Sequence, residues 1–303
     1  MLRTMTVGSE GPRMLITGGV HGDEFEPIVA IHRLSSILRD MDDQGKLSGQ
    51  VTLVPIVNES AFLRGHRCAD DQLDLARTFP GRVDGTVTEQ TAALLSDLIR
   101  GSDLYIDLHT GGTELSVFPL AGYVMHPDSR VLDIQRRMAK AFNLPVVWGT
   151  SANLEGRSLS VARDSNVPAI YCEYLGSATC SNAGVDAYHQ GCLNVLADLN
   201  LIEGTLPASQ VRWTVEDARP NSGHLQICNP APCAGCFITT RKLGDYIHAG
   251  EPLGTVIPLE FSGAYAATKP VPVLATQSGI LLVLRTFPRV RVGDSVGVIL
   301  ETS

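Results

Sequence analysis

Two short motifs of this chain carry side chains that could bind a metal ion. The motif GGVHGDE at residues 18–24 contains His21 and Glu24, three positions apart among flexible glycines. The motif YIDLHTGG at 105–112 contains His109, two residues after Asp107. Two histidines and one glutamate are a ligand set of catalytic zinc sites, which keep a further position open for water. The sequence therefore predicts one zinc ion (Zn2+) per chain, held by His21, Glu24 and His109.

Asp107 is the candidate partner of a metal ligand. Alternate side chains of a strand point to the same face, so a strand over 104–110 would put Asp107 and His109 on one side. A carboxylate there can accept the ring N–H of the histidine and fix its orientation. A lone histidine is more often a structural or surface residue than a ligand. The pairing of two such motifs nevertheless favours the metal interpretation.

Amide hydrolysis by a zinc-activated water also needs a proton carrier, and Glu173 is the candidate. Zinc lowers the pKa of a bound water to about 7, and a carboxylate can then take its proton and pass it to the leaving nitrogen. Glu173 ends the apolar segment VPAIYCE at 167–173, where packing gives no reason for a charge. The alternative interpretation is a glutamate at a strand end that points into solvent.

Arginines in an irregular segment could stabilise developing negative charge and bind a carboxylate. Residues 58–81 carry Arg64, Arg67 and Arg77 without a clear helix or strand pattern. A planar guanidinium suits both tasks, because its parallel N–H groups bind two oxygens at once. Taken singly, each of these arginines is more simply interpreted as a surface residue.

The elements that must position these motifs alternate along the chain. Apolar segments predict strands at 14–20, 51–57, 104–110 and 167–175, and helical spacing predicts helices at 24–40, 86–100, 129–143 and 182–200, with Thr88 as a helix cap. Such alternation predicts an α/β fold with a mostly parallel or mixed central sheet and flanking helices. Sites in these sheets form at the carboxyl ends of strands, where both metal motifs fall.

The pattern changes near 205–220, after which short apolar runs alternate with glycine turns. Two segments carry a similar turn, Gly244–Asp245 and Gly293–Asp294, and form a weak internal repeat. We predict a catalytic domain over 1–210 and a small all-β, barrel-like domain over 211–303 that narrows the site entrance. Cys233 and Cys236 form a C-x-x-C motif without the second pair of a zinc ribbon, which favours two ordinary thiols.

The amino-acid composition limits which binding partners and which cellular compartment we expect. The 303 residues include 32 acidic and 24 basic side chains, and a formal net charge of −8 argues against nucleic acid. No apolar run approaches the roughly 18 residues of a membrane helix, and the first residues lack the apolar core of a signal peptide. Seven scattered cysteines do not resemble a secreted disulfide framework. We expect a cytoplasmic protein that binds neither membrane nor nucleic acid; homo-oligomerisation stays open.

Taken together, the motifs resemble the succinylglutamate desuccinylase/aspartoacylase family of the zinc carboxypeptidase superfamily. The resemblance rests on GGVHGDE, on Asn58 and Arg67, on DLARTFPG at 74–81, on YIDLHTGG and on CEYLG at 172–176, in that order. It implies a zinc carboxypeptidase-like fold, with Glu173 as general base and acid and Arg67 polarising the scissile carbonyl. It also implies substrate-binding roles for Asn58 and Arg77, with Arg77 on the substrate carboxylate, and, by a looser match, for Arg163.

The chain departs from the family pattern at two positions. Glu59 follows Asn58 where the family often has proline, and Ala76 precedes Arg77 where it often has asparagine. That asparagine normally helps the arginine to bind the substrate carboxylate, and alanine cannot. The change weakens the case for aspartate and succinylglutamate compounds and favours the subgroup that deacetylates substrates such as N-acetyl-diaminobutyrate.

We therefore expect a zinc-dependent amidohydrolase that removes a short acyl group, acetyl or succinyl, from an N-acyl amino acid or a related small amide. Two alternatives stay open. One is a metallocarboxypeptidase that acts on small peptides, which the β-rich domain is expected to exclude. The other is a non-catalytic zinc-binding protein on the same fold.

Overall fold

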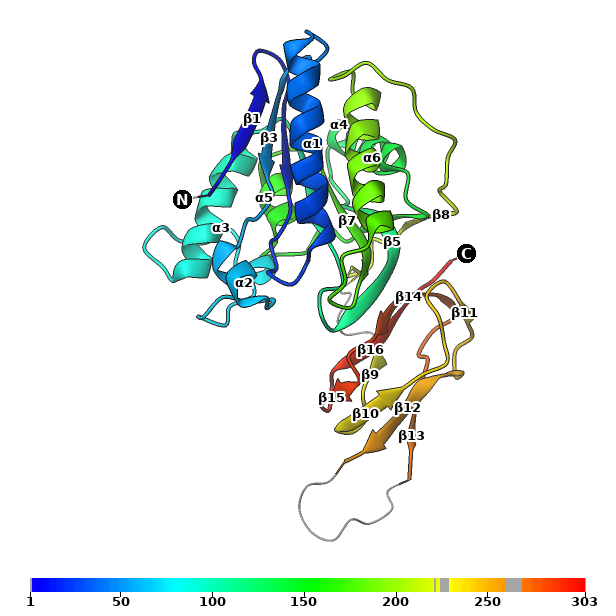
Figure 1. Ribbon diagram of the computed structural model, residues 1–303. Coiled ribbons are helices and arrows are strands. Elements are labelled where there is room, and N and C mark those ends of the chain that lie inside the picture. Colours follow the sequence, from blue (N-terminus) through cyan, green and yellow to red (C-terminus); the bar gives the residue numbers. More distant parts are fainter. Residues whose placement is uncertain (1, 221, 224–228, 260–268, 303) are drawn as a thin grey trace.

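The chain forms a large mixed β-sheet with helices on both faces and a β-rich extension at one end (Figure 1). The computed structural model describes residues 2–220, 222–223, 229–259 and 269–302. Within these residues, the observed α/β architecture matches the mixed sheet and flanking helices that the sequence predicts. No helix of the described part is long and apolar enough to cross a membrane.

Four parallel strands form the part of the sheet that carries the predicted metal motifs. Their order is β3 (Gln50–Val54), β2 (Arg13–Thr17), β4 (Leu104–His109) and β7 (Ala169–Gly176), and β1 (Met5–Gly8) adds antiparallel to β3. All six residues of β4 are buried. Strands covered on both faces need nearly continuous apolar sequence, which is why these segments are so readily recognised.

Helices cover the two faces of this sheet. The helices α1 (Glu26–Asp43), α4 (Ser129–Phe142) and α6 (Asn182–Asp198) share one core with Ile16 and Ile106. The helices α3 (Val87–Arg100) and α5 (Ser158–Asp164) share the opposite core with Leu15 and Tyr105. Neighbouring residues of one strand thus face different layers, as the alternation of a strand requires.

Some predictions of local structure are wrong, because the hydrogen-bond partners that side chains find in the folded chain determine caps and short turns. Thr86, not Thr88, caps α3: its side chain accepts the amide of Glu89, and the Glu89 carboxylate accepts the amide of Thr86. Thr88 is buried and donates to Asp71 instead. The stretch expected to be irregular contains the short helix α2 (Glu59–Arg64) and the 3₁₀ turn η1 (Leu75–Arg77).

One strand that the sequence analysis does not anticipate joins the two parts of the chain. The strand β5 (Leu115–Val124) pairs antiparallel with β7, and its second half pairs parallel with β6 (Val146–Thr150). Its first half pairs with β14 (Gly279–Arg285), so the sheet continues into the C-terminal part. The strand β8 (Trp213–Glu216) pairs with β6. Residues after the predicted boundary at 210/211 therefore still pair with a strand of the α/β part.

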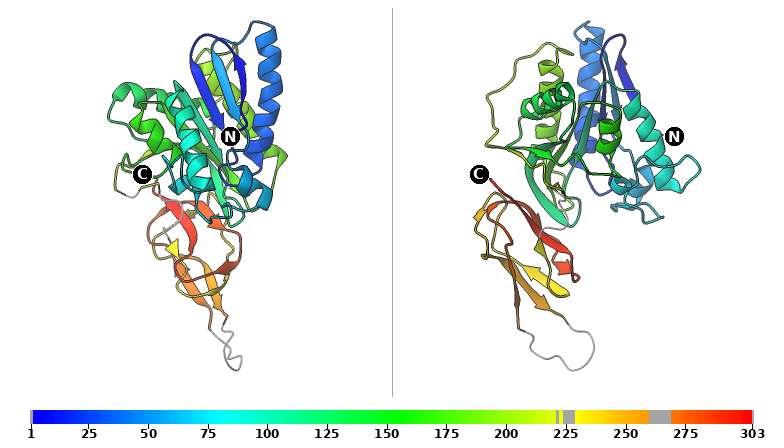
Figure 2. Two further views of the ribbon diagram at one scale, coloured as in Figure 1. Left: turned by 90° about the vertical axis from the view of Figure 1, so that its left-hand side faces the viewer. Right: turned by 180° about the vertical axis from the view of Figure 1, so that it is seen from behind.

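The described residues after β8 form only strands and turns, and they extend away from the helices (Figure 2). A four-stranded sheet contains β13 (Val271–Leu274), β12 (Pro252–Pro258), β10 (Gly235–Ile238) and β15 (Arg289–Val290). It shares an apolar core with β11 (Tyr246–Ile247), β14 and β16 (Ser295–Leu300), and β9 (Asn229–Pro230) pairs with β16. The barrel-like classification and the division into two domains stay predictions.

The two Gly-Asp turns of the predicted repeat are built alike. Gly244 and Gly293 have φ angles of 83° and 89°, a region that favours glycine. The carboxylate after each glycine accepts a backbone amide three residues earlier, at 2.8 Å from Lys242 and 2.9 Å from Arg291. The shared turn supports the repeat that the sequence suggests.

Candidate metal centre and substrate pocket

The loop after β2 and the end of β4 bring the three predicted ligands together. Glu24 lies between the two histidines, with Oε1 at 2.7 Å from His21 Nδ1 and Oε2 at 3.1 Å from His109 Nδ1. All three residues are buried, and one ligand atom from each lies within 4.8 Å of the others. This is the one such cluster of three or more potential ligands found among the described residues.

Close backbone packing holds the two loops that carry the candidate ligands. A Cβ at Gly22 would lie 2.0 Å from the carbonyl carbon of Ala61, so no larger residue fits against α2 there. Asp23 accepts the backbone amide of Thr113 at 2.8 Å and thereby ties the loop after β2 to the loop after β4. The glycines of the first motif are thus required by the approach of α2 as well as by the turn.

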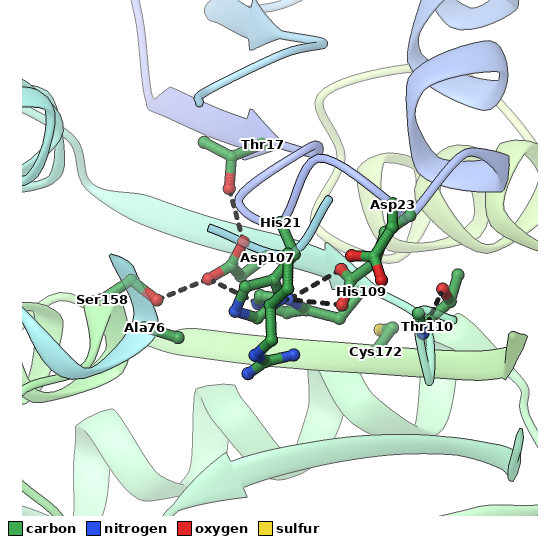
Figure 3. Close-up of polar contacts among 12 residues, drawn as sticks. Thr17, His21, Asp23, Ala76, Asp107, His109, Thr110, Ser158 and Cys172 are labelled. Carbon is green, nitrogen blue, oxygen red and sulfur yellow. Dashed lines mark hydrogen bonds and ion pairs between the residues drawn. The ribbon is translucent and has the colours of Figure 1, made fainter. Parts of the chain in front are cut away.

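The far side of each imidazole faces a carboxylate. His109 Nε2 lies 3.1 Å from Asp107 Oδ2, the contact predicted from the strand spacing. Asp107 also accepts hydrogen bonds from Thr17, at 2.7 Å, and from Ser158, which flank it in Figure 3. His21 Nε2 lies 3.1 Å from Asp74 Oδ1, a contact that sequence reasoning missed.

These contacts fit a zinc site. With both Nε2 atoms turned toward carboxylates, the Nδ1 atoms and the Glu24 carboxylate are left as the ligand set, and oriented histidines are the usual arrangement around zinc. Burial would raise the pKa of Glu24, yet His21 and His109 hold it well below its usual range. Burial would lower the pKa of His109, yet Asp107 and Glu24 raise it well above the usual value. The charges around these side chains therefore favour the binding of additional positive charge at the cluster.

Glu173 lies beside this cluster and not in solvent. It is paired in register with His109 across β4 and β7, and it is only 8% exposed. Its Oε2 atom is buried without a hydrogen-bond partner among the described residues. Burial raises the pKa of Glu173 to about 8, although the nearby His109 charge acts in the opposite direction. The interpretation as a solvent-facing strand end is therefore wrong.

Three arginines line the pocket around the cluster. Arg67 donates from Nε and Nη2 to Asp74 Oδ2, at 3.1 and 2.9 Å. Arg77 also lines the pocket, where burial and the charge of Arg157 lower its pKa to about 10. Arg157 was missed by the sequence analysis, because the segment before α5 shows no periodic pattern. Arg64, by contrast, pairs with the exposed Asp70.

Two predicted substrate residues do not line the pocket. Arg163 donates to the carbonyls of Ala152 and Leu154 and pairs with Glu155, so it holds the loop before α5. Asn58 is buried, and its Oδ1 accepts the amide of Ala61 at 3.1 Å as the cap of α2. The structure therefore places Arg157 on the pocket wall, and not Arg163 or Asn58, whose substrate-binding roles stay predictions.

The pocket combines these charges with apolar walls. It opens to solvent, and its charged residues share the walls with apolar side chains. The walls include Ala76 and the apolar or aromatic side chains of Leu115, Val117, Val124, Leu159 and Tyr171. Gly122 lies opposite Tyr171, and a Cβ there would come within 2.3 Å of the tyrosine ring. The glycine therefore makes room for this wall.

The C-terminal part contributes to the approach to the pocket. A second hollow shares Arg67, Gly111 and Leu115 with the first and therefore adjoins it. Its remaining walls include Arg285 and Phe287 from the β-rich part, and Gly223 lines the main pocket itself. Arg285 is 5% exposed and lies 3.2 Å from Glu114 in the loop before β5. This contact fixes the β-rich part beside the pocket.

Known proteins share both the sequence and the fold. The sequence model of the succinylglutamate desuccinylase/aspartoacylase catalytic domain matches residues 10–199. A curated relative from Halomonas elongata, N-alpha-acetyl-L-2,4-diaminobutyric acid deacetylase, is 33% identical over 98% of this chain and 84% of its own length. The chain belongs to the succinylglutamate desuccinylase/aspartoacylase family.

Solved structures match almost the whole chain. A succinylglutamate desuccinylase/aspartoacylase from Rhodobacter sphaeroides has a TM-score of 0.85 at 27% identity, covering 100% of this chain and 90% of that one. The product-bound ectoine utilization protein EutE (DoeB) from Ruegeria pomeroyi has a TM-score of 0.83 at 28% identity, covering 98% and 87%. Family membership confirms the resemblance drawn from the motifs.

Proposed function

We propose that this chain is a zinc-dependent hydrolase that removes a short acyl group from the amino group of a small amino acid. One observation carries the proposal: a His-Glu-His cluster, a buried Glu173 and the Arg67 guanidinium converge in one pocket. The deacetylase relative from Halomonas elongata supports the same type of reaction. A zinc ion on His21, Glu24 and His109 would supply a Lewis acid that activates water at neutral pH.

The residues of the chain have distinct roles in this proposal. Glu173 takes a proton from the attacking water and returns it to the leaving nitrogen, and a carboxyl whose pKa is raised toward neutrality is suited to both transfers. Arg67, held by Asp74, donates to the oxygen of the scissile carbonyl as negative charge develops there. Arg77 and Arg157 bind the carboxylate of the substrate.

We propose N-acetylated small amino acids as substrates, with N-acetyl-L-2,4-diaminobutyrate as the first compound to test. The named activity of the Halomonas relative supports this choice, and so does Ala76 on the pocket wall, where the family's substrate-binding asparagine is absent. Arg157 supplies a second cation beside Arg77 and compensates for that loss. The neighbouring β-rich part limits the approach and disfavours long peptides.

A substrate screen tests the function directly. The zinc-loaded protein is incubated with N-acetyl, N-succinyl and N-formyl amino acids and with a tetrapeptide, and release of free amine is measured. We expect fastest turnover of an N-acetyl amino acid and a large loss in Glu173→Gln. Equal turnover of the tetrapeptide would favour the metallocarboxypeptidase. Absence of turnover together with less than one zinc per chain after purification at neutral pH would favour the non-catalytic alternative.

A further inference from the structure

We propose that Asp74 is a positioning residue that links the metal ligand His21 to the pocket arginine Arg67. The inference rests on the proposed function, since it concerns how the parts of that site are held together. Asp74 lies in the turn before η1, outside both metal motifs. Its carboxylate contacts His21 in the loop after β2 and Arg67, which lies seven residues earlier in the chain.

Both carboxylate oxygens of Asp74 have partners. Oδ1 lies 3.1 Å from His21 Nε2 and accepts the amide of Ala76 at 2.9 Å. Oδ2 accepts two hydrogen bonds from Arg67, at 3.1 Å from Nε and 2.9 Å from Nη2. The Asp74 side chain is 24% exposed and the His21 side chain 4%, so the contacts lie in a partly desolvated region. Charge-assisted hydrogen bonds are strongest in such places.

These contacts constrain His21 and Arg67 together. A carboxylate on Nε2 fixes the ring of His21 so that Nδ1 faces Glu24, as carboxylates behind metal-binding histidines do. The two bonds to one oxygen fix the Arg67 guanidinium against rotation, which leaves its other N–H groups for a ligand in the pocket. A donor that is already aimed costs no reorganisation during the reaction.

The same carboxylate also positions Arg77. By accepting the amide of Ala76, Asp74 caps η1, the turn whose last residue is Arg77. The backbone carbonyl of Asp74 accepts the amide of Arg77 at 2.9 Å and the hydroxyl of Thr78 at 2.8 Å. A residue that only capped this turn would need no charge, since the oxygen of asparagine or serine accepts the same bond.

The need for a charge at position 74 therefore distinguishes a positioning role from a capping role. Asp74→Asn keeps the size of the side chain and one acceptor oxygen but removes the charge, and Asp74→Ser keeps only a capping oxygen. Asp71→Asn is the matched control. Asp71 lies in the same segment, but its carboxylate accepts from Thr88, at 3.0 and 2.8 Å, and not from His21 or Arg67.

The first measurement does not require activity. Each protein is stripped of metal, its zinc affinity is measured by competition with a chromophoric chelator, and its melting temperature is recorded. We expect zinc affinity to fall about 10–100-fold in both Asp74 variants, as for other carboxylates behind metal-binding histidines. Asp71→Asn should lower the melting temperature without changing zinc affinity. Unchanged affinity in folded Asp74→Asn overturns the link to His21.

The second measurement uses steady-state kinetics at saturating zinc. Asp74→Asn should lower kcat for an N-acetyl amino acid about 100-fold, with a smaller change in KM, because a misaimed donor acts mainly in the transition state. If Asp74 acts through Arg67, the double variant with Arg67→Ala should lose no more than Arg67→Ala alone. Multiplicative losses overturn the link to Arg67. If no amide is turned over, the proposed function fails, and the zinc affinities still test the link to His21.

Discussion

Replacing Glu173 by glutamine tests the central proton carrier through stability as well as through rate. Burial raises the pKa of this carboxyl from its ordinary value near 4.5 to about 8 in the metal-free protein. The folded state therefore holds a proton at pH values where the unfolded chain has lost it. This contribution to stability is fully present below about pH 4.5 and is lost as the pH rises through about 8.

The pKa values give the size of the effect. Each unit of difference between the folded and unfolded states corresponds to about 1.4 kcal/mol, so at pH 7 the native glutamate costs up to about 3 kcal/mol relative to its stability at low pH. Glutamine has the same shape and does not titrate. The stability of metal-free Glu173→Gln relative to the natural protein should therefore rise steadily between pH 4.5 and 8 and level off above it.

Thermal unfolding of the chelator-treated proteins across this pH range measures the difference. A change of about 3 kcal/mol corresponds to several degrees in the melting temperature of a protein this large. Bound zinc should reduce the difference, because its charge stabilises the neighbouring carboxylate. The zinc-loaded variant should lose about 100- to 10,000-fold in kcat while keeping stoichiometric metal. Two results would refute the reasoning. One is a difference in melting temperature between the two metal-free proteins that does not change with pH. The other is undiminished turnover by the variant.

Three further substitutions test other parts of the site. Asp107→Asn should weaken zinc binding about 10–100-fold in chelator competition, because the ring of His109 loses its charged partner. Asp103 contacts Arg13 at the surface, so the control variant Asp103→Asn should leave zinc binding unchanged. Arg157→Ala should raise KM for substrates with a free carboxylate at least tenfold, whereas Arg163→Ala should lower the melting temperature with little effect on KM. Equal effects of the two variants on KM would contradict the proposed role of Arg157. Gly122→Ala should displace the Tyr171 ring, lower the free energy of unfolding by about 1–3 kcal/mol in denaturant unfolding, and reduce kcat/KM. Unchanged stability and kcat/KM would show that the ring can move at no cost.

Local sequence carried the information for the predicted metal ligands and for most of the buried strands. His21 and Glu24 lie within one turn, and Asp107 and His109 lie on one strand, so covalent geometry alone limits how far apart their side chains can be. The parallel strands are buried on both faces, which demands continuous apolar residues that are visible without any neighbour. Glu173 was recognisable for the same reason, as a charge within such a strand.

The tertiary structure alone decided which polar residues in and beside the irregular segments reach the pocket. Asn58 and Arg163 have suitable side chains, yet one caps α2 and the other holds a neighbouring loop. Asp74 contacts His21 and Arg157 lines the pocket, although no periodic pattern marks either residue. The pairing of β5 with both β7 and β14 could likewise not be predicted from the sequence. Outside regular elements no fixed period relates sequence position to side-chain direction, so contacts between distant segments decide where each side chain points.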